Sequence, residues 1–348
     1  MPNVTTVPLR RVSPFGRTVA RLLLSVALLS AAALPSACHT LSNETIQATD
    51  ENLARLNAAL YRKPKDATLR YERGRVLMDL QRLNEAIADL QAATELDPDN
   101  IDYLLSLSDA FFANGNVEKS YETLQRALDL NPEHFEALLK MSEITFYSKD
   151  FDRSMAMLNK VTAQDPNNRT AFFMKGFIYK ETGDTLNAIQ YFRRVTEMYP
   201  DYAPAFEELG VLYAVRKSPL AVEYLNSAMR LDPDNLNIVY NLAMYYQELD
   251  EPEMATDLYV KILEKDPQNK YAWHNRGYMS MILYHDYDAA IDFFTKAIEA
   301  DNTYVDAHIN RGLAYEMKGD KTNAAICYRT ALQLDPNNEQ ASVALSRL

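Results

Sequence analysis

The chain has 348 residues, 47% of them hydrophobic, and a formal net charge of −12. This hydrophobic content excludes a wholly disordered protein, and the length allows two ordinary domains or one long repeat array. Tyr is abundant (22) and Gly is scarce (9), which favours helices with aromatic packing over a β-sandwich. Because the chain is acidic and has no cluster of Lys and Arg, binding to nucleic acid is not expected.

Residues 1–37 are typical of a signal peptide. They contain four Arg and no Lys, Asp or Glu, and the apolar run from Leu22 to Leu34 follows the last Arg. As a helix, this run would reach about 20 Å, which is short of a hydrocarbon core of about 30 Å. We therefore exclude residues 1–37 from the folded part.

Ser36 and Ala37, directly before Cys38, resemble the lipobox of bacterial lipoproteins. The resemblance implies that Cys38 is lipidated and that residues 38–47 form a tether. Pro35 departs from the aliphatic residue usual in that family, so ordinary signal cleavage or an uncleaved anchor stay open. A twin-arginine signal at Arg10 and Arg11 is a further alternative, although the residues after it fit poorly.

A Pro-containing turn recurs at a nearly fixed interval. The marker residues stand 33 to 35 residues apart and are Pro64, Pro98, Pro132, Pro166, Pro200, Pro233, Pro267, Asn302 and Pro336. A fixed period in this range indicates a solenoid of repeated units.

Within each unit the sequence alternates between helix and turn. The eighth residue is always small: Gly74, Ser108, Ser142, Gly176, Gly210, Ala243, Gly277 and Gly312. The twentieth is small as well: Ala86, Ser120, Ser154, Ala188, Ala221, Ala255, Ala290 and Ala324. Large residues at helical spacing surround these positions, and breakers such as "NGN" at Asn114–Asn116 separate two helices.

This pattern resembles the tetratricopeptide repeat (TPR) family, which has small residues at positions 8 and 20, aromatic residues at 11 and 24, and Pro near the end. "VDAHINRGLAYEMKGDKTNAAICYRTALQLDPNN" matches over nearly its full length. The resemblance implies an all-α superhelical solenoid, with a half-unit cap helix at 48–66 and a C-terminal cap helix at 339–348. The eight expected units are 67–100, 101–134, 135–168, 169–202, 203–235, 236–269, 270–304 and 305–338.

No catalytic or metal-binding motif stands out. The five His show no metal-ligand spacing, and we expect His274 and His308 to be ordinary surface or packing side chains on helix surfaces. The Asp-x-Asp pairs lack the Gly and Glu of a calcium loop. We expect no enzymatic activity, metal, cofactor or small-molecule substrate.

In the TPR family, the first helix of each unit lines a concave groove. The apolar residues that this register places there are Leu105, Phe112, Leu139, Phe146, Tyr147, Phe173, Met174 and Phe177. An exposed apolar row usually marks a partner site, although neighbouring helices or the N-terminal segment could also cover it.

Asn241, Asn275 and Asn310 form a row at the sixth position of the later units. The row resembles the asparagine ladder with which some TPR proteins hold an extended peptide. Asn is also common at this position of the family, so a row without a ligand is the alternative. We expect Arg276 and Arg311 to form ion pairs between units.

The residues together predict a lipoprotein of a bacterial cell envelope, anchored by acyl chains and presenting a TPR scaffold or adaptor to a protein or peptide. In layout it resembles lipoproteins that help to assemble pilus or secretion machines. His39 after the Cys favours the periplasmic face of the outer membrane. A soluble periplasmic or secreted peptide-binding chaperone, and an accessory subunit of an enzyme, are the alternatives.

Overall fold

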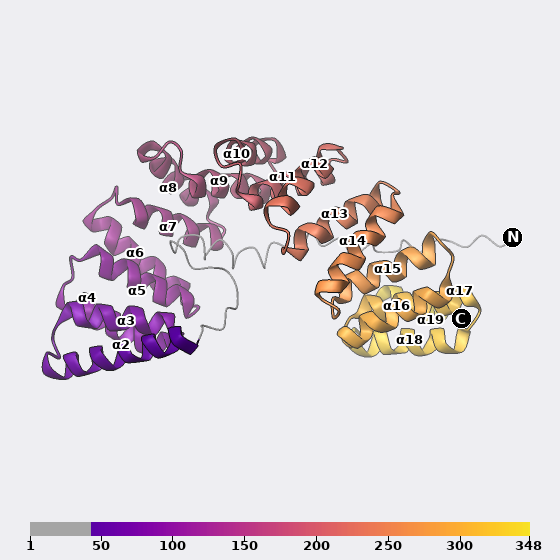
Figure 1. The fold of residues 1–348 in the computed structure, drawn as a ribbon, viewed down its shortest axis with the longest axis horizontal. Coiled ribbons are helices and arrows are strands. Elements are labelled where there is room, and N and C mark those ends of the chain that lie inside the picture. Colours follow the sequence, from indigo (N-terminus) through magenta and orange to yellow (C-terminus); the bar gives the residue numbers. More distant parts are fainter. Residues whose placement is uncertain (1–42) are drawn as a thin grey trace. The chain divides into compact units, whose positions relative to one another are not determined.

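The computed structural model describes residues 43–348, so the predicted signal peptide and Cys38 lie outside the described residues. All regular elements of this part are helices, labelled in Figure 1. They belong to two compact units, residues 43–194 and 195–348, and the division falls within α10. The all-α fold expected from the sequence is confirmed for the described residues.

Helix pairs follow one another along each unit. The first unit contains α2 (Asn43–Arg62), α3 (Ala67–Asp79), α4 (Leu83–Leu96), α5 (Ile101–Ala113), α6 (Val117–Leu130), α7 (Phe135–Tyr147), α8 (Phe151–Gln164), α9 (Arg169–Glu181) and most of α10 (Thr185–Met198). The second contains α11 (Ala203–Val215), α12 (Leu220–Leu231), α13 (Leu236–Glu248), α14 (Pro252–Lys265), α15 (Lys270–Ile282), α16 (Tyr287–Ala300), α17 (Val305–Lys318), α18 (Lys321–Leu334) and α19 (Glu339–Ser346).

The odd-numbered helices lie at the first position of each pair. From α3 and α4 to α17 and α18, such a helix packs against the even-numbered helix that follows it, and for α9 and α10 the contact includes the rings of Phe173 and Phe192. Several of them also contact the next odd-numbered helix, as α11 contacts α13 and α15 contacts α17. The first helices therefore lie close together within a unit, as the family resemblance implies for the helices that line the groove.

Helix α2 starts earlier than expected. It begins at Asn43, whereas the sequence assigned residues 38–47 to a tether and began the cap helix at residue 48. The polar run at its start is compatible with a solvated helix, so polarity alone does not separate a tether from a helix end. Leu53, Leu56 and Leu60, on one face of α2, are buried.

The recurring Pro turn both ends one helix and starts the next. In the turn before α5, the Asn100 side chain donates to Asp97 Oδ2 at 3.0 Å, while Asn100 Oδ1 accepts from the backbone N–H of Tyr103. Asp165 and Asn168 repeat this arrangement before α9. A side-chain oxygen that satisfies a free N–H of the first turn is the usual N-cap interaction, so in these pairs the turn determines where the first helix begins. Helices α11 and α17 begin without a side-chain cap, after Tyr202 and Tyr304.

The turn inside each pair requires a left-handed residue. Gly115, Gly183 and Gly319 adopt positive φ there, but other pairs use a residue with a side chain, such as Lys149 with φ 60°. A left-handed backbone raises the conformational energy of a residue with a Cβ by about 1–2 kcal/mol. Gly has no Cβ and adopts this conformation without that cost. These turns are therefore sites of local strain.

We predict that Lys149→Gly raises the free energy of unfolding by about 1 kcal/mol, since it removes this strain at an exposed position. Chemical denaturation followed by circular dichroism measures the change. Gly115→Ala is the matched control: an added Cβ meets no atom within 4 Å there, but φ is 77°, so we expect a loss of similar size. A destabilised Lys149→Gly variant would contradict the strain argument.

Candidate functional site

The apolar row expected in the groove of the early units is mostly covered. Leu105, Phe146, Phe173, Met174 and Phe177 are each at most 7% exposed, so they do not form the open surface that the sequence analysis expected. Their cover comes from neighbouring helices, which was the alternative considered from the sequence.

These buried residues form an aromatic cluster that crosses helix boundaries. The Phe146 ring on α7 lies 6.5 Å from the Phe177 ring on α9, and Phe177 contacts Phe173 at 4.8 Å and Phe192 of α10 at 5.3 Å. Met174 accepts a hydrogen bond from Ser142 of α7 at its sulfur. The cluster holds successive pairs together, and truncating it would destabilise the fold before it changed a binding surface.

Three members of the row remain accessible to a partner. Tyr147, at the end of α7, is 50% exposed, while Phe112 and Leu139 are half-buried. The rings of Phe112 and Tyr147 meet edge to face, with their centroids 5.8 Å apart. Phe112 on α5 and Tyr147 on α7 therefore form a small accessible apolar surface in the predicted groove, and Leu139 lies about two helical turns earlier on α7.

The three Asn of the later units are buried and already hydrogen-bonded. Asn241 donates to Glu207 Oε1 at 3.1 Å, and Asn275 donates to the Tyr240 hydroxyl at 2.8 Å. Asn310 Nδ2 lies 2.9 Å from Nε2 of the His274 ring.

In each case the partner belongs to the preceding first helix, so the row links α11 to α13, α13 to α15, and α15 to α17. Peptide binding by this row stays a prediction, and it would require the amides to exchange their present partners.

His274 and His308 are 2% and 5% exposed, so they are packing side chains, which is one of the two roles expected for them. The expectation about two Arg residues is wrong. Arg276 and Arg311 do not form ion pairs between units: Arg276 lies over aromatic rings, and Arg311 donates to Thr295 and Cys327. Helical spacing assigned these residues to a face without showing what the neighbouring helices place against it.

An ion pair that was not predicted from the sequence links the early units. Lys140 of α7, with a side chain that is 7% exposed, contacts Asp109 of α5 at 2.9 Å. Burial lowers the pKa of Lys140, but the nearby carboxylates, above all that of Asp109, together more than offset this effect, and the pKa of the ammonium is raised. The sequence could have indicated this pair, because Asp109 and Lys140 lie on the groove faces of adjacent units and have opposite charges.

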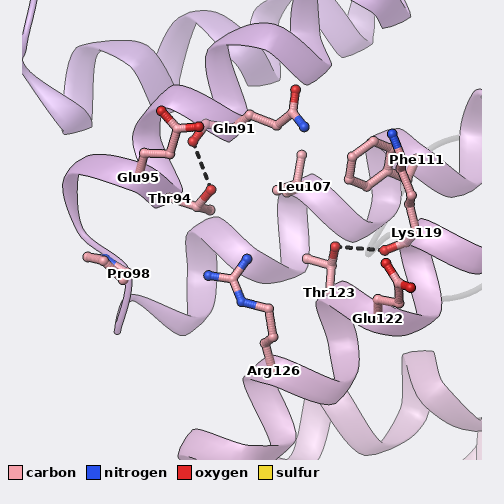
Figure 2. Close-up of a pocket in the computed structure, with 10 residues that line it drawn as sticks. All are labelled: Gln91, Thr94, Glu95, Pro98, Leu107, Phe111, Lys119, Glu122, Thr123 and Arg126. Atoms are coloured by element: carbon pink, nitrogen blue, oxygen red, sulfur yellow. Dashed lines mark hydrogen bonds between the residues drawn. The ribbon is translucent and has the colours of Figure 1, made fainter.

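A surface cavity of about 370 Å³ lies away from the predicted groove residues, over α4, α5 and α6. Figure 2 shows the side chains of Leu107 and Phe111 together with those of Lys119, Glu122 and Arg126 around it. Its two threonine hydroxyls donate within their own helices, to the carbonyls of Gln91 and Lys119. The charged side chains are of both signs and do not define one ligand class.

Among residues 43–348 no group of three His, Cys, Asp or Glu side chains is placed to hold a metal ion. In the same part of the chain, no helix is both long enough and apolar enough to cross a membrane.

Comparison with known families identifies the repeats. A model described as "TPR repeat" matches residues 74–115, and three described as "Tetratricopeptide repeat" match residues 111–174, 170–202 and 305–338. Together with the helix pairs, these matches show that the chain is a tetratricopeptide repeat protein.

Curated relatives match over limited segments. A segment of 107 residues, 30% of this chain, is 33% identical to Tetratricopeptide repeat protein 17 of Danio rerio. It spans only 9% of that protein. A segment of 127 residues, 35% of this chain, is 28% identical to the uncharacterized protein ycf37 of Cyanophora paradoxa and spans 70% of it.

Solved structures share the fold over a larger part of the chain. The C-terminal part of a TPR repeat-containing protein from Cytophaga hutchinsonii aligns with a TM-score of 0.58 and 20% identity, covering 71% of this chain and 99% of that one. A TPR protein from Parabacteroides merdae has a TM-score of 0.55 at 15% identity, covering 71% and 97%. PilW, described as a type IV pilus biogenesis factor, has a TM-score of 0.52 at 18% identity, covering 60% and 96%. At these identities the likeness shows the fold alone.

We predict that His274 makes folding stability depend on pH. Burial lowers the pKa of its ring from 6.5 to about 4, so the unfolded chain binds the proton more readily between these values. The contribution of the neutral His274 ring to stability is therefore fully present above pH 6.5, and it is lost as the pH drops toward 4. We expect His274 to account for a loss of about 2 kcal/mol between pH 7.5 and pH 5.

Denaturant melts at several pH values measure this effect as the difference in slope between the wild type and His274→Gln. His285→Gln, at an exposed turn, is the control and should keep the wild-type slope. If His274→Gln keeps that slope as well, the ring does not stay neutral in the folded protein.

Proposed function

We propose that this protein is a membrane-anchored scaffold or adaptor of a bacterial cell envelope, which binds a partner protein or peptide through the first helices of its TPR units. The observation that carries the proposal is the accessible apolar surface of Phe112 and Tyr147, whose rings meet on two successive first helices. Exposed apolar side chains at one place on a monomer are typical of a protein contact. TPR repeats are, as a family, frameworks for protein contacts, and the absence of enzymatic activity is part of the proposal.

The anchor is proposed from the sequence. Residues 1–37 are typical of a signal peptide, and Ser36 and Ala37 before Cys38 resemble a lipobox. Acyl chains on Cys38 would hold the repeats at a membrane, and His39 favours the periplasmic face of the outer membrane. A single acyl chain binds a membrane only marginally, whereas two give stable anchoring.

Participation in the assembly of a secretion or pilus machine is part of the same proposal. PilW is described as a pilus biogenesis factor and has the same fold, at an identity too low to transfer its role. Support therefore comes from the architecture: a signal peptide, a Cys and a TPR array in one chain.

A soluble periplasmic or secreted peptide-binding chaperone is the alternative, and Pro35 favours it, because the lipobox family usually has an aliphatic residue there. The two candidates differ in whether Cys38 carries lipid. They share the requirement for an accessible surface on the repeats.

We predict that growth with a radiolabelled fatty acid labels the wild-type protein and that Cys38→Ser abolishes the label. The Sγ atom of Cys38 is the atom that would carry the lipid, so replacement of the thiol by a hydroxyl removes the attachment site. Autoradiography of the immunoprecipitated protein measures the label, and membrane fractionation reports its consequence. An unlabelled wild type would exclude the anchor and leave the soluble alternative.

We predict that Tyr147→Ser lowers recovery of the natural partner about tenfold, because loss of an aromatic residue that contributes strongly to binding costs about 1.4 kcal/mol or more. Cross-linking in the native envelope, followed by mass spectrometry, measures recovery. Tyr61→Ser on α2 is the matched control, since Tyr61 is 91% exposed and lies away from this surface. Equal recovery from both variants would place the partner site elsewhere.

A further inference from the structure

Two cations lie against two stacked aromatic rings on α15 and α16. The rings of Trp273 and Phe293 stack with their centroids 5.8 Å apart and an angle of 20° between their planes. The Arg276 guanidinium lies 4.3 Å from the centroid of Phe293, and the Lys296 ammonium lies 4.9 Å from that of Trp273. The Trp273 N–H donates to the carbonyl of Pro267 at 2.9 Å, which holds the indole in this orientation.

Arg276 has no carboxylate partner among the described residues. Its side chain is half-buried, and desolvation by burial is the cause that lowers the pKa of the guanidinium. Lys296 differs, since it contacts Asp292 at 2.8 Å one helical turn away. The contact with the aromatic rings partly offsets the cost of burying the guanidinium. It occupies the faces of the guanidinium, while the N–H groups remain available to an acceptor.

The unit of residues 43–194 contains a second arrangement of this kind. The rings of Phe172 and Tyr191 are stacked at 6.0 Å, and the cations of Lys175 and Arg194 lie 5.7 and 4.4 Å from the centroid of Phe172. Lys175 donates to the hydroxyl of Thr162, and desolvation followed by the charge of Arg194 lowers its pKa. No carboxylate contributes to the pKa shift of Arg276 or of Lys175.

The pair of α3 and α4 shows which kind of residue can face the basic side chain at this place in a unit. Asp89 stands at the place in α4 that corresponds to Tyr191 in α10 and Phe293 in α16. Its carboxylate receives hydrogen bonds from Arg70 at 2.9 Å and from Arg73 at 2.5 and 2.7 Å. Arg73 corresponds in register to Arg276, so the chain itself supplies a carboxylate to this basic position in one pair and an aromatic ring in another.

We propose that Arg276 and Lys296, with the rings of Trp273 and Phe293, bind a carboxylate side chain of a partner. The proposal rests on the proposed function as a protein-binding scaffold and names the chemistry of one partner contact. A carboxylate fits the N–H edge of a guanidinium with two parallel hydrogen bonds, and the rings offer an apolar surface to a neighbouring side chain.

The charge around this cation–aromatic cluster limits what can bind. Residues 195–348 contain 24 acidic and 13 basic side chains, so the unit as a whole repels an acidic chain. This net charge favours a short motif with one Glu or Asp next to an apolar residue over a long acidic tail.

Trp273 makes the proposal directly testable, because it is the chain's single tryptophan and belongs to the cluster. The full chain is titrated with the peptide acetyl-Gly-Phe-Glu-Gly-amide while tryptophan fluorescence is recorded. We expect a saturable change with this peptide, and binding at least about tenfold weaker when Gln replaces its Glu, since a charge-assisted hydrogen bond is lost. Arg276→Gln should weaken binding of the Glu peptide by a similar factor, with Arg276→Lys in between.

Arg230→Gln is the control variant, because Arg230 is exposed on α12 and donates to Ser227 away from the cluster. It should bind the Glu peptide as the wild type does. Thermal melts of each variant establish that it is folded before the titration.

The proposal is overturned by no saturable change, by equal affinity for the Glu and Gln peptides, or by unchanged binding in folded Arg276→Gln. Inorganic phosphate is titrated in parallel, and tighter saturable binding of phosphate at Trp273 would overturn the assignment to a carboxylate. The titration uses no natural partner, so its result is independent of the cross-linking experiment at Tyr147. One combined outcome is partner recovery that depends on Tyr147 while the fluorescence of Trp273 stays unchanged on titration. That combination would refute this contact alone and leave the scaffold proposal standing.

Discussion

The fold depends on the close approach of the two helices within each pair. In the pairs that have Gly at the eighth position, a side chain would collide with a large residue of the second helix: a Cβ on Gly176 would lie 2.6 Å from the Phe192 ring, and one on Gly210 would lie 2.5 Å from Leu225. Phe192 and Leu225 are fully buried. Because buried groups pack as densely as in a crystal, the small residue and the large one are needed together.

Two pairs satisfy the same constraint with serine. Ser108 and Ser120 lie with their hydroxyl oxygens 2.7 Å apart, and Ser154 donates to the carbonyl of Ser142 at 2.8 Å. A hydroxyl in a buried contact must find a partner, and here the facing helix provides it. The contact between helices therefore tolerates a change in chemistry as long as the residue stays small and its hydrogen bonds are made.

The fold could be predicted from the sequence because its pattern lies within single repeat units. The exposure and the contacts of the candidate site residues could not, because they depend on the neighbouring units. The spacing of the Pro turns and the small residues at the eighth and twentieth positions are properties of one unit, so they identify helix pairs directly. The exposure of Phe173 or Asn275 depends on what the adjacent pair places against it. Helical spacing assigns a residue to a face and does not show that Asn275 will meet Tyr240. The Arg276 cluster was missed for the same reason, since its rings come from two helices.

Contacts between the described helices join close neighbours in the chain, one or two helices apart. Each contact closes a short loop, which lowers the entropic barrier to folding compared with folds whose first and last strands must meet. A helix pair can therefore acquire its packing soon after its own residues become available, without waiting for the far end of the chain. During synthesis or transport through a narrow channel, the helix pairs can fold one after another, in the order in which they emerge.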